Sequence, residues 1–77
     1  MTTIIGVSLE NRIEASVEFQ RILTDYGCDI RTRLGLHPSK DNACSNKGII
    51  LLEVINNAEE LKSELAKHWE VQTMVFD

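Results

Sequence analysis

Basic charge is scarce in this sequence and is nowhere concentrated. Eight Lys and Arg residues stand against 12 Asp and Glu, which leaves a net charge of -4 at pH 7. Only Arg31 and Arg33 form a close pair. Non-specific binding to nucleic acid needs clustered Lys and Arg to neutralise phosphates. The composition therefore argues against direct contact with nucleic acid.

Histidine, glycine and cysteine are too sparse for the common catalytic arrangements. His37 and His68 are the only histidines, and neither belongs to a recognisable set of nucleophile and base. The four glycines are dispersed along the chain, which excludes a glycine-rich phosphate loop. Cys28 and Cys44 are too far apart for a C-x-x-C site. We therefore predict a protein that is not an enzyme.

Long apolar runs and targeting signals are also missing. No apolar run approaches the roughly 20 residues that a transmembrane helix needs, and the N-terminal residues do not resemble a signal peptide. We expect a cytoplasmic protein with reduced thiols and no membrane partner. A length of 77 residues predicts a single domain over 1–77.

What the sequence does contain is an apolar run from Gly48 to Ile55, interrupted only by Glu53. Its length, and the Asn-Asn pair that follows it, predict a strand that is buried on both faces. Alternation divides the apolar side chains into one set of Ile50, Leu52 and Val54 and an opposite set of Ile49, Leu51 and Ile55. A chain this short can cover one face of a sheet with helices. The other face must then meet another copy of the molecule or a ligand.

The rest of the chain predicts two helices and three more strands. Residues 12–26 and 58–68 have helical periodicity, with Gly27 expected as a left-handed stop for the first helix and Asn57 as the N-cap of the second. Strands are predicted over 2–9, 28–36 and 70–77. The order strand, helix, strand, strand, helix, strand is that of a ferredoxin-like α+β fold. In this βαββαβ sandwich both helices lie on one face of a four-stranded antiparallel sheet, and the strands at 2–9 and 48–55 are central.

The second strand carries the most distinctive charges. Period two predicts that Arg31, Arg33 and Gly35 face outward, while the inward set is Ile30, Thr32, Leu34 and Leu36. Arg31 and Arg33 can hold an anionic ligand or a carboxylate of a partner subunit; alternatively, their charge protects an edge strand from unwanted pairing. Glu53 is either their ion-pair partner in an oligomer or, in a small dimeric ferredoxin-like enzyme, the titratable group of a sheet-face cavity.

A loop over 37–47 joins the second and third strands. It contains His37 and Cys44, whose side chains are of the types that can bind nickel, copper or zinc. Two ligands do not complete a site, so a metal-binding module also needs a second subunit or a further donor such as Asp41. The alternative is that the two residues are unrelated parts of a mobile loop.

Three segments carry a resemblance to a known family: Ile22-Leu23-Thr24-Asp25-Tyr26-Gly27, Arg33-Leu34-Gly35-Leu36 and Gly48-Ile49-Ile50-Leu51-Leu52. With them the chain resembles the iron-only hydrogenase system regulators, which belong with the ACT-like domains and the C-terminal domain of the nickel-responsive repressor. The resemblance covers nearly the whole chain. It implies a regulatory domain that assembles as a dimer or tetramer through its sheets and senses a small molecule or a metal.

These observations lead to one main prediction. We expect a non-enzymatic, homo-oligomeric regulatory domain in which a small ligand at a subunit interface favours one arrangement of subunits. The residues predicted for that ligand site are Arg31, Arg33 and Gly35, together with the 37–47 loop. The alternatives are a nickel or zinc module that uses His37 and Cys44, and the small enzyme that uses Glu53.

Overall fold

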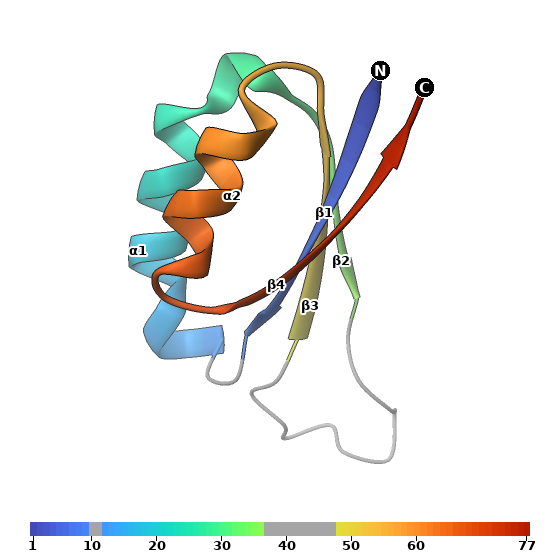
Figure 1. Cartoon of the computed structure of the whole chain (residues 1–77). Helices are drawn as coiled ribbons and strands as arrows, with labels where there is room; N and C mark the ends of the chain where they lie inside the picture. The colour runs from blue at the N-terminus through green and yellow to red at the C-terminus, as the bar shows by residue number, and fades with distance from the viewer. Residues whose placement is uncertain (10–11, 37–47) are drawn as a thin grey trace.

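The computed structural model describes residues 1–9, 12–36 and 48–77, and over 12–16 it describes the backbone alone. Its elements follow the predicted order (Figure 1): β1 (Thr2–Leu9), α1 (Arg12–Asp25), the 3-10 turn η1 (Gly27–Asp29), β2 (Ile30–Leu36), β3 (Gly48–Val54), α2 (Ala58–Ala66) and β4 (Glu70–Phe76). No helix in these ranges is long and apolar enough to cross a membrane.

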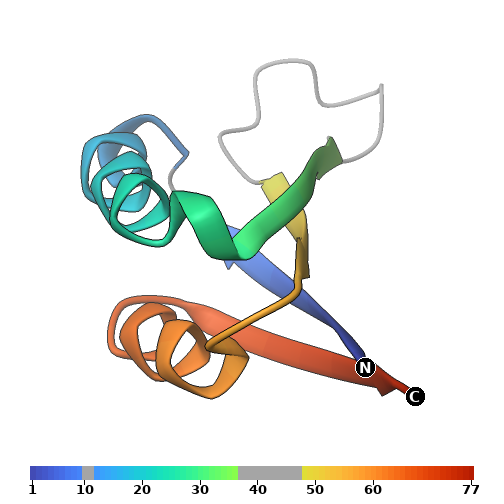
Figure 2. The same cartoon turned by 90° about the horizontal axis from the view of Figure 1, so that it is seen from above.

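The four strands form one antiparallel sheet in the order β2-β3-β1-β4. Both helices lie on the same side of this sheet, and no helix of the described ranges covers its other side (Figure 2). This is the predicted ferredoxin-like α+β arrangement, with β1 and β3 in the centre. Thr2 of β1 pairs with Phe76 of β4, so the two ends of the chain emerge side by side (Figure 1).

The core lies between the sheet and the helices. Alternate residues of β1 point into it, which confirms the period-two prediction for this strand, and α1 and α2 cover them with their apolar stripes. Phe19 of α1 meets Trp69 edge to face, with ring centroids 5.4 Å apart. The buried apolar side chains are Ile5, Val7, Leu9, Phe19, Ile22, Leu23, Leu52, Val54, Leu61 and Leu65.

The two predicted helix boundaries differ in detail from the structure. Gly27 does not adopt a positive φ; instead the chain continues from α1 into the 3-10 turn η1. Asn57 precedes α2 in the left-handed region, at φ 57° and ψ 33°, and its side chain does not cap the helix. Its Nδ2 donates to Asp29 Oδ2 over 3.2 Å, which ties the start of α2 to the turn before β2.

The predicted facing of β2 is wrong after its first residue. Ile30 pairs with Val54, but the next pair is Thr32 with Glu53, so Arg31 is an extra residue in a β-bulge. Paired residues share a face, and Arg33 pairs with the buried Leu52. Arg33 and Gly35 therefore face the helices, whereas the residues on the opposite side of the sheet are Thr32, Leu34 and Leu36.

Candidate functional site

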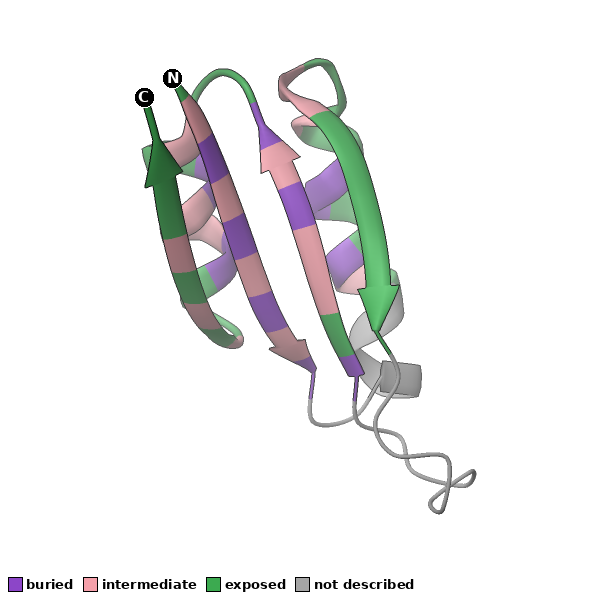
Figure 3. Ribbon diagram, turned by 90° about the vertical axis from the view of Figure 1, so that its right-hand side faces the viewer, coloured by how far each residue is buried: buried purple, intermediate pink, exposed green. Residues whose placement is uncertain are grey.

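The side of the sheet opposite the helices, which we call the open face, is covered by neither of the two described helices. Figure 3 views the sheet from this side. The strand registers place its residues in three rows across β2, β3, β1 and β4. The rows are Thr32-Glu53-Ile4-Met74, Leu34-Leu51-Gly6-Gln72 and Leu36-Ile49-Ser8-Glu70.

The open face is mainly apolar and accessible. Leu34 is 54% exposed and Met74 55%, and Phe76 extends the same surface at 56%. Ile49 and Leu36 are also exposed. A contiguous apolar patch of this kind marks an interaction site more often than a solvated surface. The apolar set of Ile49 and Leu51, which the sequence predicts to need a cover, lies on this face.

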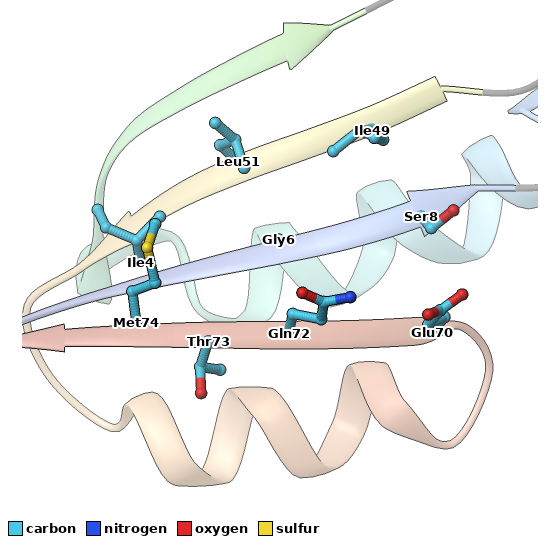
Figure 4. A pocket seen from close by; sticks show the side chains of 9 residues that line it. All are labelled: Ile4, Gly6, Ser8, Ile49, Leu51, Glu70, Gln72, Thr73 and Met74. Atoms are coloured by element: carbon cyan, nitrogen blue, oxygen red, sulfur yellow. The ribbon is translucent and has the colours of Figure 1, made fainter. Parts of the chain in front are cut away.

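A shallow depression lies near the centre of the open face, between β3, β1 and β4 (Figure 4). Gly6 stands at its middle because it has no side chain to fill the space. Ile4, Met74 and Leu51 form an apolar end, and Ser8 and Glu70 form a polar end. The volume of the depression is about 270 Å³. The depression can therefore receive a molecule with an apolar body and offer hydrogen bonds to a polar group at one end of that molecule.

The backbone does not require glycine at position 6. Gly6 has no positive φ, and a Cβ placed there would lie 3.4 Å from Leu51 Cδ2 and 3.8 Å from the Gln72 carbonyl oxygen, which are ordinary contacts. A glycine in a strand interior lowers stability relative to alanine. The fold of a single chain therefore does not explain why position 6 lacks a side chain.

Glu53 forms the polar corner of the open face with the two bulge residues. Thr32 Oγ1 donates to Glu53 Oε1 over 2.8 Å, and Arg31 Nη1 lies 3.5 Å from Glu53 Oε2. The predicted pairing of Arg31 with Glu53 thus occurs within one chain. These contacts give Glu53 a structural role in holding the bulge.

Arg33 and Gly35 lie on the opposite side of the sheet from this corner. Arg33 Nη1 donates to Gln20 Oε1 of α1 over 3.1 Å. A small hollow between α1 and β2 is lined by both residues and by Phe19 and Ile50. The structure therefore separates the three residues predicted for one ligand surface: Arg31 reaches Glu53, and Arg33 and Gly35 face α1.

The candidate metal ligands His37 and Cys44 lie outside the described residues. Within the described ranges, no group of three or more His, Cys, Asp and Glu side chains is placed to hold a metal ion. The other cysteine, Cys28, is exposed and has a free thiol.

Two parts of the open face were missed at the sequence level. Gln72 and Met74 alternate correctly in the predicted final strand, but nothing in their spacing assigns them to a site. The position of Gly6 in the middle of an apolar strand was the available signal, since an isolated strand glycine often marks a close approach by another group.

No protein-family model matches this chain, and no curated protein sequence does so.

Proposed function

We propose that this protein is a non-enzymatic, cytoplasmic regulatory domain that assembles with copies of itself through the open face. The observation that carries the proposal is the uncovered apolar surface opposite the helices, where Leu34, Met74 and Phe76 are each more than half exposed. The sequence resemblance to the iron-only hydrogenase system regulators supports the same function.

Energetics favour covering this surface. Removing apolar surface from water contributes roughly 25 cal/mol for each Å². A domain of 77 residues has a small core and a stability of a few kcal/mol. Association through the open face adds to that stability, because a partner that binds only the folded state shifts the folding equilibrium.

The depression around Gly6 is the proposed position of a small ligand. A second subunit closes it from above, so that a molecule with an apolar body and a polar end contacts both subunits. Such a ligand changes the arrangement of subunits only to the extent that it binds one arrangement more tightly. Ligand occupancy is then read out as a change in assembly rather than as a chemical reaction.

The test is the solution mass of the protein by light scattering behind a sizing column, across the micromolar range. We expect a dimer or a tetramer. Ile49→Glu places a charge on the open face and should give a monomer, because an unpaired charge is costly to bury in an interface. Val17→Glu is the matched control, since Val17 is 80% exposed on α1 and should leave the mass unchanged. A monomeric wild-type protein would contradict the proposal.

A further inference from the structure

The charged side chains of the open face lie at two opposite corners. Arg31 and Glu53 occupy the corner where β2 begins. Glu70 occupies the corner where β4 begins, three strands away and at the far end of the paired segment. The other two corners are apolar and are formed by Leu36 of β2 and Met74 of β4. One diagonal of the face is thus polar and the other apolar.

The three rows form a nearly square grid of paired positions at the centre of the open face. Four residues separate Ile4 from Ser8, which is roughly 14 Å along a strand, and three gaps between four strands also span roughly 14 Å. A second copy can cover such a face with its strands either aligned with those of the first copy or perpendicular to them. Both aligned and orthogonal packings of two sheets are known arrangements.

The two-fold axis that relates two such faces can lie in several directions, and the charges at the corners distinguish the resulting dimers. An axis along the strands, or across them within the sheet plane, sets Arg31 and Glu70 against the apolar corners of the partner, where desolvation is costly. An axis along the polar diagonal sets the Arg31–Glu53 ion pair against its own copy and sets Glu70 against Glu70, where two carboxylates meet without a cation between them. Only an axis along the apolar diagonal, from Leu36 to Met74, sets each Arg31 against the partner's Glu70.

We propose that a second copy of this chain packs crosswise on the open face, so that Arg31 of each subunit, which lies 3.5 Å from its own Glu53, also forms an ion pair with Glu70 of the other. Stacked sheets lie roughly 10 Å apart, a gap that an extended Arg and an extended Glu span together. The same axis places Leu36 against Leu36 and Met74 against Met74. The Gly6 depressions of the two subunits then face each other near the centre.

The size of the surface is close to the minimum that a specific dimer needs. Four strands of about seven residues cover roughly 19 Å by 24 Å, or about 450 Å² for each subunit. Specific interfaces bury at least about 500 Å² on each partner. The open face is therefore slightly below this minimum, so the peripheral charges are expected to decide whether association occurs. The inference rests on the proposed assembly through this face.

Two charge-reversed variants test the arrangement. Arg31→Glu alone sets a carboxylate at position 31 against the partner's Glu70, and Glu70→Arg alone sets a guanidinium at position 70 against the partner's Arg31. Each variant should therefore dimerise at least about tenfold more weakly than the wild type. An equimolar mixture restores both opposite-charge pairs, because each Arg31→Glu subunit meets a Glu70→Arg subunit. The mixture should dimerise at least about threefold more tightly than either variant alone. Rescue is expected to be partial, because Arg31→Glu also loses its contact with Glu53 of the same chain.

The measurement is sedimentation velocity of each variant and of the mixture. Glu59→Arg is the control for altered net charge, because Glu59 is exposed in the first turn of α2; it should associate like the wild type and should not rescue either variant. If the wild type associates but both reversals associate equally well, or the mixture gives no rescue, the crosswise arrangement is wrong and assembly itself stands. If the wild type is monomeric, both proposals are wrong.

Discussion

Among single residues, Gly6 is where the stability of one chain and the proposed self-association make opposite demands. Gly6→Ala should leave the single chain as stable as before or stabilise it by about 0.5 kcal/mol, because alanine restricts the unfolded chain and its Cβ meets only ordinary contacts. The same methyl group projects into the depression and should weaken self-association. Urea unfolding at low concentration and the light-scattering mass measure the two effects separately. A loss of stability without a change in mass would contradict this assignment.

Glu53 offers a second prediction for a single residue. Glu53→Ala should lower the free energy of unfolding by about 1 kcal/mol, because the Thr32 hydroxyl loses its acceptor. Glu53→Gln keeps an acceptor and should cost less. Glu70→Ala serves as the control, since no described side chain pairs with Glu70 within the chain, and it should change stability by only a few tenths of a kcal/mol. Urea unfolding of the variants below the association range provides the comparison.

In the helices, two surface ion pairs predict a pH effect. The hydrogen bond from Arg21 lowers the pKa of Glu18 below 4.5, and that from Lys67 lowers the pKa of Glu64. A lowered pKa in the folded state means that the stabilisation is present at neutral pH and is lost as pH falls through the folded pKa. The side chains of Glu18 and Glu64 are 40% and 37% exposed, so solvent screens both pairs and the stabilisation is small.

NMR titration of the two carboxyl groups measures this effect. Arg21→Gln should return the pKa of Glu18 toward 4.5 and change that of Glu64 much less, since Arg21 is the smallest influence on Glu64. Lys67→Gln should do the reverse. Equal shifts at both carboxyls in either variant would contradict the assignment of each pair.

The buried face of α2 gives a prediction of a larger change in the free energy of unfolding. Leu61 is fully buried against the sheet, so Leu61→Ala should destabilise the protein by about 2 to 5 kcal/mol through lost burial and the cavity that remains. This is comparable to the whole stability expected for so small a domain, so the cooperative urea transition should move to low urea or vanish. Val17→Ala on the exposed side of α1 should change stability by less than about 0.5 kcal/mol.

Sequence patterns were sufficient to assign the faces of the strands in which apolar residues alternate without a bulge. β1 alternates without interruption from Thr3 to Leu9, and the register of its neighbour β3 follows the same alternation, so the faces of both strands were assigned correctly as far as Val54. Ile55, which was predicted to continue β3, lies beyond its end. The order of elements then determined the topology. For β2 the same reasoning assigned Arg33 and Gly35 to the wrong face.

The error in β2 has a local cause. A bulge adds one residue to one strand without altering the sequence periodicity, so the alternation from Ile30 to Leu36 continues while its phase against the sheet changes. Nothing in the identity of Arg31 marks it as the added residue. The contact of Glu53 with both Arg31 and Thr32, which stabilises the bulge, is between strands and depends on the three-dimensional register. The ligand set predicted on this strand was separated for that reason.

For the molecule as a whole, assembly should be visible in the unfolding temperature. If folded subunits associate through the open face, the midpoint of thermal unfolding should rise with protein concentration, because the oligomer is favoured by mass action. Ile49→Glu should remove this dependence, and Val17→Glu should retain it. Differential scanning calorimetry over an approximately hundredfold range of protein concentration makes the comparison. A midpoint that does not move in the wild type would contradict assembly of the folded state.

The adjacent chain ends have a practical consequence. Because β1 and β4 run antiparallel and Thr2 pairs with Phe76, both ends leave the sheet at one point. Neighbouring ends are the geometric condition for inserting a domain into a host protein or for circular permutation. A host enzyme that carries this domain in a surface loop would have its two halves held together or strained according to the folding of the insert. The domain is thus suited to insertion into a surface loop of a host protein.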